Sequence, residues 1–155
     1  MNYPYSIAVD TSGRFAYVTN LVPVNSNFYM SSFAIDSTLG ALTFVNFTPP
    51  LGAGTAGAAT DPLGQFVYAT QNGDNGLVAL SFDSTTDTFT LLNSDVCAPQ
   101  STPISITVDP SGKFVYVANA GSTANNITAC AIDQTTGDLS NIAGQSAVAA
   151  GMAPI

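Results

Sequence analysis

The side chains that could do chemistry in this sequence are few, and most of them are aspartates. The chain has ten acidic residues, all of them Asp, with Arg14 and Lys113 as its only cations and no His. Ester hydrolysis needs a general base that activates water and a donor that stabilises the oxyanion. With neither His nor Glu available, no Ser-His-Asp triad can form. We therefore assign no catalytic residue.

Arg14 and Lys113 are the only residues that could clamp a phosphorylated substrate. They follow Gly13 and Gly112 in the matching stretches SGRF and SGKF, so we interpret them as parts of a repeated framework. The glycine-rich stretch LGAGTAG, residues 51–57, lacks the strand and helix that flank a nucleotide-binding loop. We interpret it as a flexible crossing between two repeats and assign no cofactor-binding residue.

Six aspartates occupy recurring positions in two series of predicted turns. The first series is Asp10, Asp61 and Asp109, and the second is Asp36, Asp83 and Asp133. An Asp side chain that opens a turn accepts a hydrogen bond from a backbone N–H further along it, and we predict this role for all six. Asp74 lies in the oxygen-rich loop QNGDNG but lacks the alternating acids and closing Glu of calcium loops. We assign no metal ligand.

The framework that carries these residues is a threefold internal repeat. The stretches PYSIAVDTSGRFAYVTN (4–20), AGAATDPLGQFVYATQN (56–72) and PISITVDPSGKFVYVAN (103–119) share a turn Asp, a turn Gly and a pair of aromatic residues at the same relative positions. A second half also recurs, as SSFAIDSTLGALTFV, VALSFDSTTDTFTLL and TACAIDQTTGDLSNI. A period of 40–50 residues indicates a solenoid, a propeller or another repeat array.

Each repeat predicts four short antiparallel strands. In the third repeat, SITVD and KFVYVAN flank DPSG, a type I turn sequence, and two further strands follow at ITACAID and, more weakly, DLSNIAG. No segment keeps a helical period for ten residues. Four strands in a meander form one propeller blade. We therefore predict one all-β domain over 1–155, a partial β-propeller with blades at about 1–54, 55–101 and 102–155.

The sequence also resembles a known family. Tyr17-Val18-Thr19-Asn20 spells the signature of YVTN β-propellers, and the wider frame is similar to lactonase-type seven-bladed propellers related to 6-phosphogluconolactonase. This resemblance implies hydrolysis of a sugar lactone. The functional residues of the lactonases cannot be carried over, because the chain has no position that could receive a catalytic His or Glu.

Composition limits the partners and the compartment. A net charge of −8 argues against nucleic acid and anionic membranes, and no apolar run is long enough for a transmembrane helix. The first residues, MNYPYS, do not form a signal peptide, so the chain is cytoplasmic, mature or cut from a longer one. Scarce charge and abundant Ser, Thr and Asn favour an extracellular or cell-surface protein. Asn46 and Asn126 begin sequons and are candidate glycosylation sites, unless these sequons arise by chance.

Two cysteines leave two alternatives open. Cys97 and Cys130 could form a disulfide in an oxidising compartment. Cys130 aligns with Phe33 and Leu80 of the other repeats, at a strand position whose side chain is expected to point inward. We favour a buried free thiol that packs as a small apolar side chain.

Three blades are too few to close a propeller, which needs four to eight. Each end blade would expose an apolar face of roughly 700 Å², close to one side of a standard protein interface. Other blades of a longer chain, a second copy in a six-bladed ring, or further copies in a filament would cover it. We expect a non-catalytic scaffold, binding platform or self-assembling subunit that forms homo-oligomers or polymers through its end blades. The alternative is a fragment or protomer of a lactonase-type enzyme.

Overall fold

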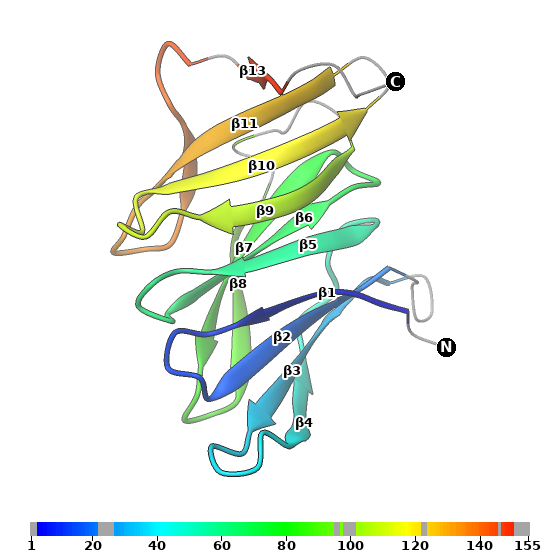
Figure 1. The fold of residues 1–155 in the computed structure, drawn as a ribbon, viewed down its shortest axis with the longest axis vertical. Helices are drawn as coiled ribbons and strands as arrows, with labels where there is room; N and C mark the ends of the chain where they lie inside the picture. The colour runs from blue at the N-terminus through cyan, green and yellow to red at the C-terminus, as the bar shows by residue number, and fades with distance from the viewer. Residues whose placement is uncertain are drawn as a thin grey trace.

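The computed structural model describes residues 3–21, 27–94, 97, 102–121, 124–145 and 147–150, and it consists of three antiparallel sheets (Figure 1). The first sheet contains β1 (Pro4–Val9), β2 (Phe15–Asn20), β3 (Met30–Ile35) and β4 (Leu42–Phe47). The second contains β5 (Thr55–Thr60), β6 (Phe66–Gln71), β7 (Gly76–Asp83) and β8 (Thr88–Ser94). The third contains β9 (Pro103–Val108), β10 (Phe114–Gly121), β11 (Ala124–Ile132) and β12 (Leu139–Asn141).

Within each sheet the strands follow one another in chain order, which confirms the predicted meanders. The described residues contain no helix, and so none that could span a membrane. The third sheet differs from the other two at its outer edge. Its last strand, β12, has three residues, and the unpredicted strand β13 (Val148–Ala149) pairs with β11 beyond it.

The first turn of each sheet has the geometry that its sequence predicts. The N–H of Gly64 donates to the carbonyl of Asp61 at 3.0 Å, and Gly13 and Gly112 make the same bond to Asp10 and Asp109. All three glycines have a φ between 68° and 70°. This is the left-handed region that glycine enters at no steric cost, so the turns reverse the chain tightly and set the register of the hairpins.

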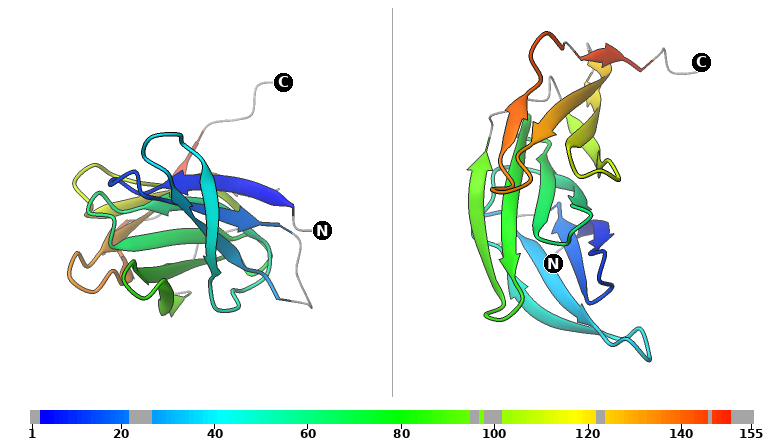
Figure 2. Two further views of the ribbon diagram at one scale, coloured as in Figure 1. Left: turned by 90° about the horizontal axis from the view of Figure 1, so that it is seen from below. Right: turned by 90° about the vertical axis from the view of Figure 1, so that its left-hand side faces the viewer.

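The three sheets are stacked like a fan. Strands β1, β5 and β9 lie side by side along one edge of the stack (Figure 1). The right-hand view of Figure 2 shows the sheets following one another along a curve from the N-terminal to the C-terminal sheet. The second sheet is therefore covered on both faces, whereas the first and third sheets are each covered by the described residues on one face only.

Two apolar clusters fill the spaces between the sheets. Tyr17 on β2 packs edge-on against Phe82 and Phe89 of the second sheet, with ring centroids 5.7 and 5.9 Å apart. Tyr68, at the same place in the second repeat, packs in the cluster shared with the third sheet. All six residues of β6 are buried, because both faces of this strand meet a neighbouring sheet.

Polar contacts between sheets fix their register. The Tyr68 hydroxyl donates to the carbonyl of Gly137 at 3.1 Å, and burial raises the pKa of Tyr68, which keeps this donor protonated. Nearer the edge formed by β1, β5 and β9, the Thr19 hydroxyl donates to the carbonyl of Ala56. Such bonds require one relative position of the sheets, so they define how two blades fit together.

Candidate functional site

The turn aspartates are occupied by backbone N–H groups, as predicted. Asp61 Oδ1 accepts from the amides of Gln65 and Phe66 at 2.6 and 2.7 Å, and Oδ2 accepts from the amide of Leu63 at 3.0 Å. Equivalent backbone donors serve Asp10, Asp36, Asp83, Asp109 and Asp133. The six carboxylates therefore anchor turns.

The hydrogen bonds to Asp36, Asp83 and Asp109 make stability depend on pH. The Ser111 hydroxyl, 2.5 Å from Asp109 Oδ2, lowers the pKa of Asp109, and hydrogen bonds likewise lower the pKa of Asp36 and Asp83. A carboxyl whose pKa is lower in the folded state stabilises the fold above its unfolded pKa of about 3.9. Urea unfolding should thus give constant stability from about pH 5 to 7 and a loss as the pH falls below about 4. Ser111→Ala should reduce this loss, and an unchanged pH profile would contradict the assignment.

The two cations do not form a clamp. Arg14 lies on the first turn of the first sheet, where its Nε donates to Ser12 at 3.1 Å and its guanidinium lies over the Phe15 ring. Lys113 lies on the first turn of the third sheet and is exposed. The second sheet stands between these two turns, so the structure does not bring the cations together.

The loop around Asp74 and the stretch 51–57 bind each other. Asp74 Oδ2 accepts from the amide of Ala53 at 2.5 Å, and the amide of Gly73 donates to the Ala53 carbonyl. The stretch forms the crossing from the first to the second sheet, as predicted, and its last residues begin β5 at Thr55. Within the described ranges, no three His, Cys, Asp or Glu side chains are placed to hold a metal ion.

Cys97 and Cys130 form a disulfide, so the prediction of a buried free thiol was wrong. Cys130 does occupy the expected inward position on β11, where it is fully buried. Cys97 follows β8 and is also buried. The bond ties the chain just beyond β8 to β11 in the third sheet, and Cys130 replaces the larger side chains that Phe33 and Leu80 provide at the equivalent places.

The repeat places one set of apolar side chains on the face toward the next sheet and another set on the face toward the previous one. The forward-facing set comprises three series: Phe15, Phe66 and Phe114; Tyr17, Tyr68 and Tyr116; Met30, Leu77 and Ile127. The backward-facing set comprises four series: Ile7, Ala58 and Ile106; Phe33, Leu80 and Cys130; Ile35, Phe82 and Ile132; Leu42, Phe89 and Leu139. In each junction of the structure, one forward set meets one backward set.

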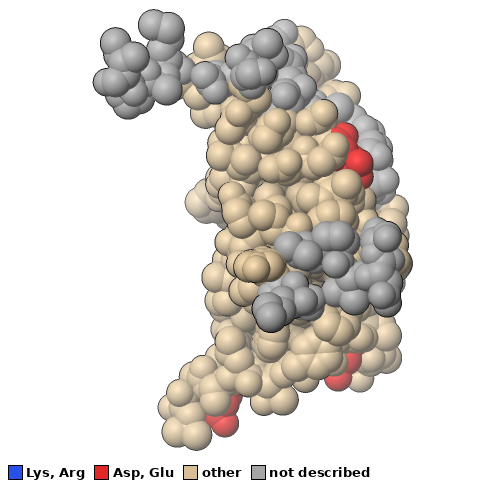
Figure 3. Space-filling model, turned by 90° about the vertical axis from the view of Figure 1, so that its right-hand side faces the viewer, with Lys and Arg blue, Asp and Glu red and all other residues tan. Residues whose placement is uncertain are grey.

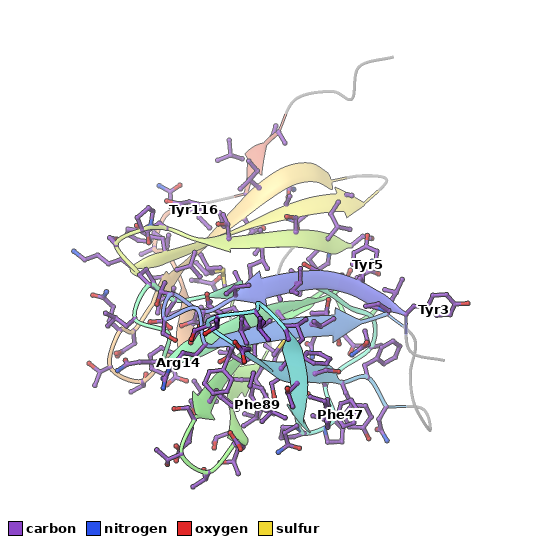
Figure 4. All side chains as sticks on the ribbon, turned by 60° about the horizontal axis from the view of Figure 1, so that its bottom comes forward. Tyr3, Tyr5, Arg14, Phe47, Phe89 and Tyr116 are labelled. Carbon is purple, nitrogen blue, oxygen red and sulfur yellow. A yellow bond between two sulfur atoms is a disulfide. The ribbon has the colours of Figure 1, made fainter. Side chains whose placement is uncertain are left out.

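The third sheet's forward set has no sheet to meet within the described chain. Tyr116 is 40% exposed, whereas Tyr17 and Tyr68 are at most 1% exposed. Ile127 is also exposed, although the equivalent Met30 and Leu77 are buried. We call Phe114, Tyr116 and Ile127 the tail face. Figure 4 shows Tyr116 on the third sheet, well away from Phe47 on the first.

The first sheet's backward set is exposed in the same way. Ile7 is 57% exposed and Leu42 is 52% exposed, whereas the equivalent Ile106 and Leu139 are 8% and 3% exposed. We call Ile7, Phe33, Ile35 and Leu42 the head face. The sequence predicts apolar end faces, but dividing the residues between the two faces requires the strand register, which the structure supplies.

Each end face carries a shallow hollow. One of about 250 Å³ lies over β1 and β2 between Tyr5, Ile7 and Val18. Another of about 170 Å³ lies on the third sheet beside Tyr116 and Ile127. The side of the molecule in Figure 3 is largely uncharged, with isolated acidic side chains and no Lys or Arg among the described residues. The hollows themselves are lined mainly by apolar side chains, so they suit apolar partners.

Both predicted glycosylation sites are partly buried and hydrogen-bonded. The amide of Asn46 donates to the carbonyl of Asp87 in the second sheet at 2.8 Å. The side-chain oxygen of Asn126 accepts from Asn119 at 2.7 Å. Glycosylation at Asn46 and Asn126 stays a prediction.

Comparisons with known proteins identify the fold. The model of a family described as Lactonase, 7-bladed beta-propeller, matches residues 7–153, and curated proteins gave no match. Among solved structures, a candidate 6-phosphogluconolactonase from Bacteroides fragilis superposes with a TM-score of 0.78 at 23% identity, covering 94% of this chain and 39% of its own. Another candidate 6-phosphogluconolactonase, from Bacteroides uniformis, superposes with a TM-score of 0.77 at 19% identity, covering 94% of this chain and 41% of its own. A protein from Lactobacillus plantarum superposes with a TM-score of 0.75 at 22% identity, covering 94% of this chain and 42% of its own.

The chain thus spans about two fifths of the length of these solved relatives. At such identities the superposition shows the fold, and the three sheets correspond to part of a larger propeller. The family match extends over nearly the whole sequence. The chain therefore belongs to the lactonase family of seven-bladed β-propellers and contains a three-blade part of that fold.

Proposed function

We propose that this chain works by contact, as a propeller module whose head and tail faces bind protein, and that it does not hydrolyse lactones by itself. The observation that carries the proposal is the exposure of the tail and head faces, whose repeat equivalents are buried in the junctions between sheets. The polar groups support it, because six of the ten aspartates anchor turns and the sequence has no His or Glu.

We further propose that the module acts outside the cell. The disulfide between Cys97 and Cys130 is the main support, because disulfides persist in oxidising compartments and are rare in the cytosol. The low fraction of charged residues, 8%, and the two sequons are consistent with this location. Detection of a glycan at Asn46 or Asn126 on protein purified from its natural source would strengthen the proposal.

A lactonase-type enzyme, of which this chain is a part or one protomer, is the second candidate. The family match and the names of the two Bacteroides neighbours favour it. In that case the catalytic groups would come from blades outside this chain.

A direct assay separates the two candidates. We expect gluconolactone and 6-phosphogluconolactone to open in the presence of the purified chain at the buffer rate, because the sequence has no His or Glu and six of its ten Asp carboxylates are engaged by turn amides. The measurement is proton release at constant pH, with heat-unfolded protein as the control. Saturable turnover above the rate of the unfolded control would overturn the proposal.

A further inference from the structure

We propose that the tail face of one copy docks on the head face of a second copy, in the same register that joins neighbouring blades within the chain. This inference rests on the proposed contact function and names the partner. A single structural pattern supports it: both junctions between the described sheets pair a forward set with a backward set, and the described residues leave one further set of each kind exposed.

The two faces carry the repeat equivalents of the residues that meet in the two junctions within the chain. Where β2 meets the second sheet, the rings of Phe15 and Tyr17 contact Phe82 at centroid distances of 5.0 and 5.7 Å. The tail face presents Phe114 and Tyr116 for the same purpose. The head face presents Ile35 at the place of Phe82, so an aromatic pair would pack on an aliphatic side chain, as Phe66 and Tyr68 do on Ile132 in their cluster.

The hairpin between β3 and β4 provides a specific contact site for the tail face of a second copy. In the second junction the Phe66 ring lies so close to Gly137 that any side chain there would collide with it, and the Tyr68 hydroxyl binds the Gly137 carbonyl. Gly40 holds the same place in the first sheet, also with a positive φ, and no atom lies within 4 Å of where its Cβ would be. We therefore infer that Phe114 of a second copy covers Gly40 and that its Tyr116 hydroxyl donates to the Gly40 carbonyl.

We infer a head-to-tail contact, since a tail-to-tail or head-to-head contact would pair two faces of the same kind, which neither junction within the chain does. Head-to-tail contacts close into a ring when the rotation allows it and otherwise continue as a filament. A face of roughly 700 Å² is close to one side of a standard interface. The residues that define the two faces are uncharged, so the net charge of −8 per copy opposes association only at long range, and salt screens it.

Complementation between two blocked variants tests this arrangement. Leu42→Asp blocks the head face, and Tyr116→Asp blocks the tail face, because each buries an unpaired charge in the contact. By light scattering after size-exclusion chromatography, wild-type protein should exceed the 15.8 kDa of one chain. Each variant alone should be monomeric, and their mixture should form a one-to-one dimer through the one intact head and the one intact tail. Tyr116→Phe should weaken self-association about fivefold, the effect of one hydrogen bond.

The control is Leu63→Asp, on a turn of the second sheet and outside both end faces. Leu63 is 68% exposed, more than the 52% of Leu42. This control variant should assemble like the wild type, and circular dichroism should show the same β signal for all variants. If each variant forms dimers on its own, the head-to-tail contact is overturned, but the proposed contact function still stands, with a symmetric contact in its place. A monomeric wild type together with a mixture that forms no dimer would overturn both the arrangement and self-association. Lactone turnover would instead refute the proposed function alone.

Discussion

Tyr68→Ala is expected to lower the free energy of unfolding by about 4 kcal/mol, the usual cost of removing a buried aromatic ring. Tyr116→Ala, at the same place in the next repeat, should cost less than about 1 kcal/mol when the protein is dilute, because the ring is already partly in water. Tyr68 is fully buried and its hydroxyl binds Gly137, whereas Tyr116 is 40% exposed. Urea unfolding of both variants at low protein concentration measures the difference.

A second pair of variants separates the ring from the hydroxyl. Tyr68→Phe keeps the packing and leaves the Gly137 carbonyl without its donor, so it should cost about 1 kcal/mol. Tyr116→Phe should have no measurable effect on the dilute chain. Equal losses at positions 68 and 116 would mean that the tail face is covered within a single molecule, against the structure.

Removing the disulfide is expected to have a comparable effect. Cys97 and Cys130 are separated by 33 residues, and closing a loop of this size stabilises a fold by about 4 kcal/mol in the chain-entropy model. Reduction should therefore lower the midpoint of thermal unfolding by roughly 10 °C. Calorimetry with and without a reductant measures the shift.

The double variant Cys97→Ala/Cys130→Ala provides the control for that experiment. It should unfold near the temperature of the reduced wild type, and the reductant should not change it further. A wild-type midpoint that the reductant leaves unchanged, with both thiols shown to be free, would contradict the stabilising role of the bond.

The sequence predicts most of the fold because the repeat shows each position three times. The series Tyr17, Tyr68 and Tyr116 identifies a strand that faces a neighbouring sheet, and Asp10, Asp61 and Asp109 identify the turn before it. The same comparison predicts that the outer faces are apolar. It does not show on which face a given residue lies, because that depends on strand register and on the order of the sheets in space.

The sequence allowed the disulfide as one of two alternatives but could not decide in its favour, for a physical reason. Cys130 belongs to the repeat, and its equivalents Phe33 and Leu80 are apolar, which favoured a packing role. Cys97 follows β8 outside the aligned stretches, so the repeat gives no distance between the two sulfur atoms. Strand β13 was missed similarly, because two residues without a counterpart in the other repeats carry no periodic signal.

The hydroxyl of Thr19 has a mechanical consequence for an assembly of this kind. It fastens β2 to the carbonyl of Ala56 in the following sheet, whereas the third repeat has Ala118 at the equivalent position and cannot make this bond. A string of copies would be stiffer at that first junction within each chain than at the joints between chains. Under tension or bending, the contacts between chains, one after every three blades, would therefore break first. The copies would separate while each chain stayed folded.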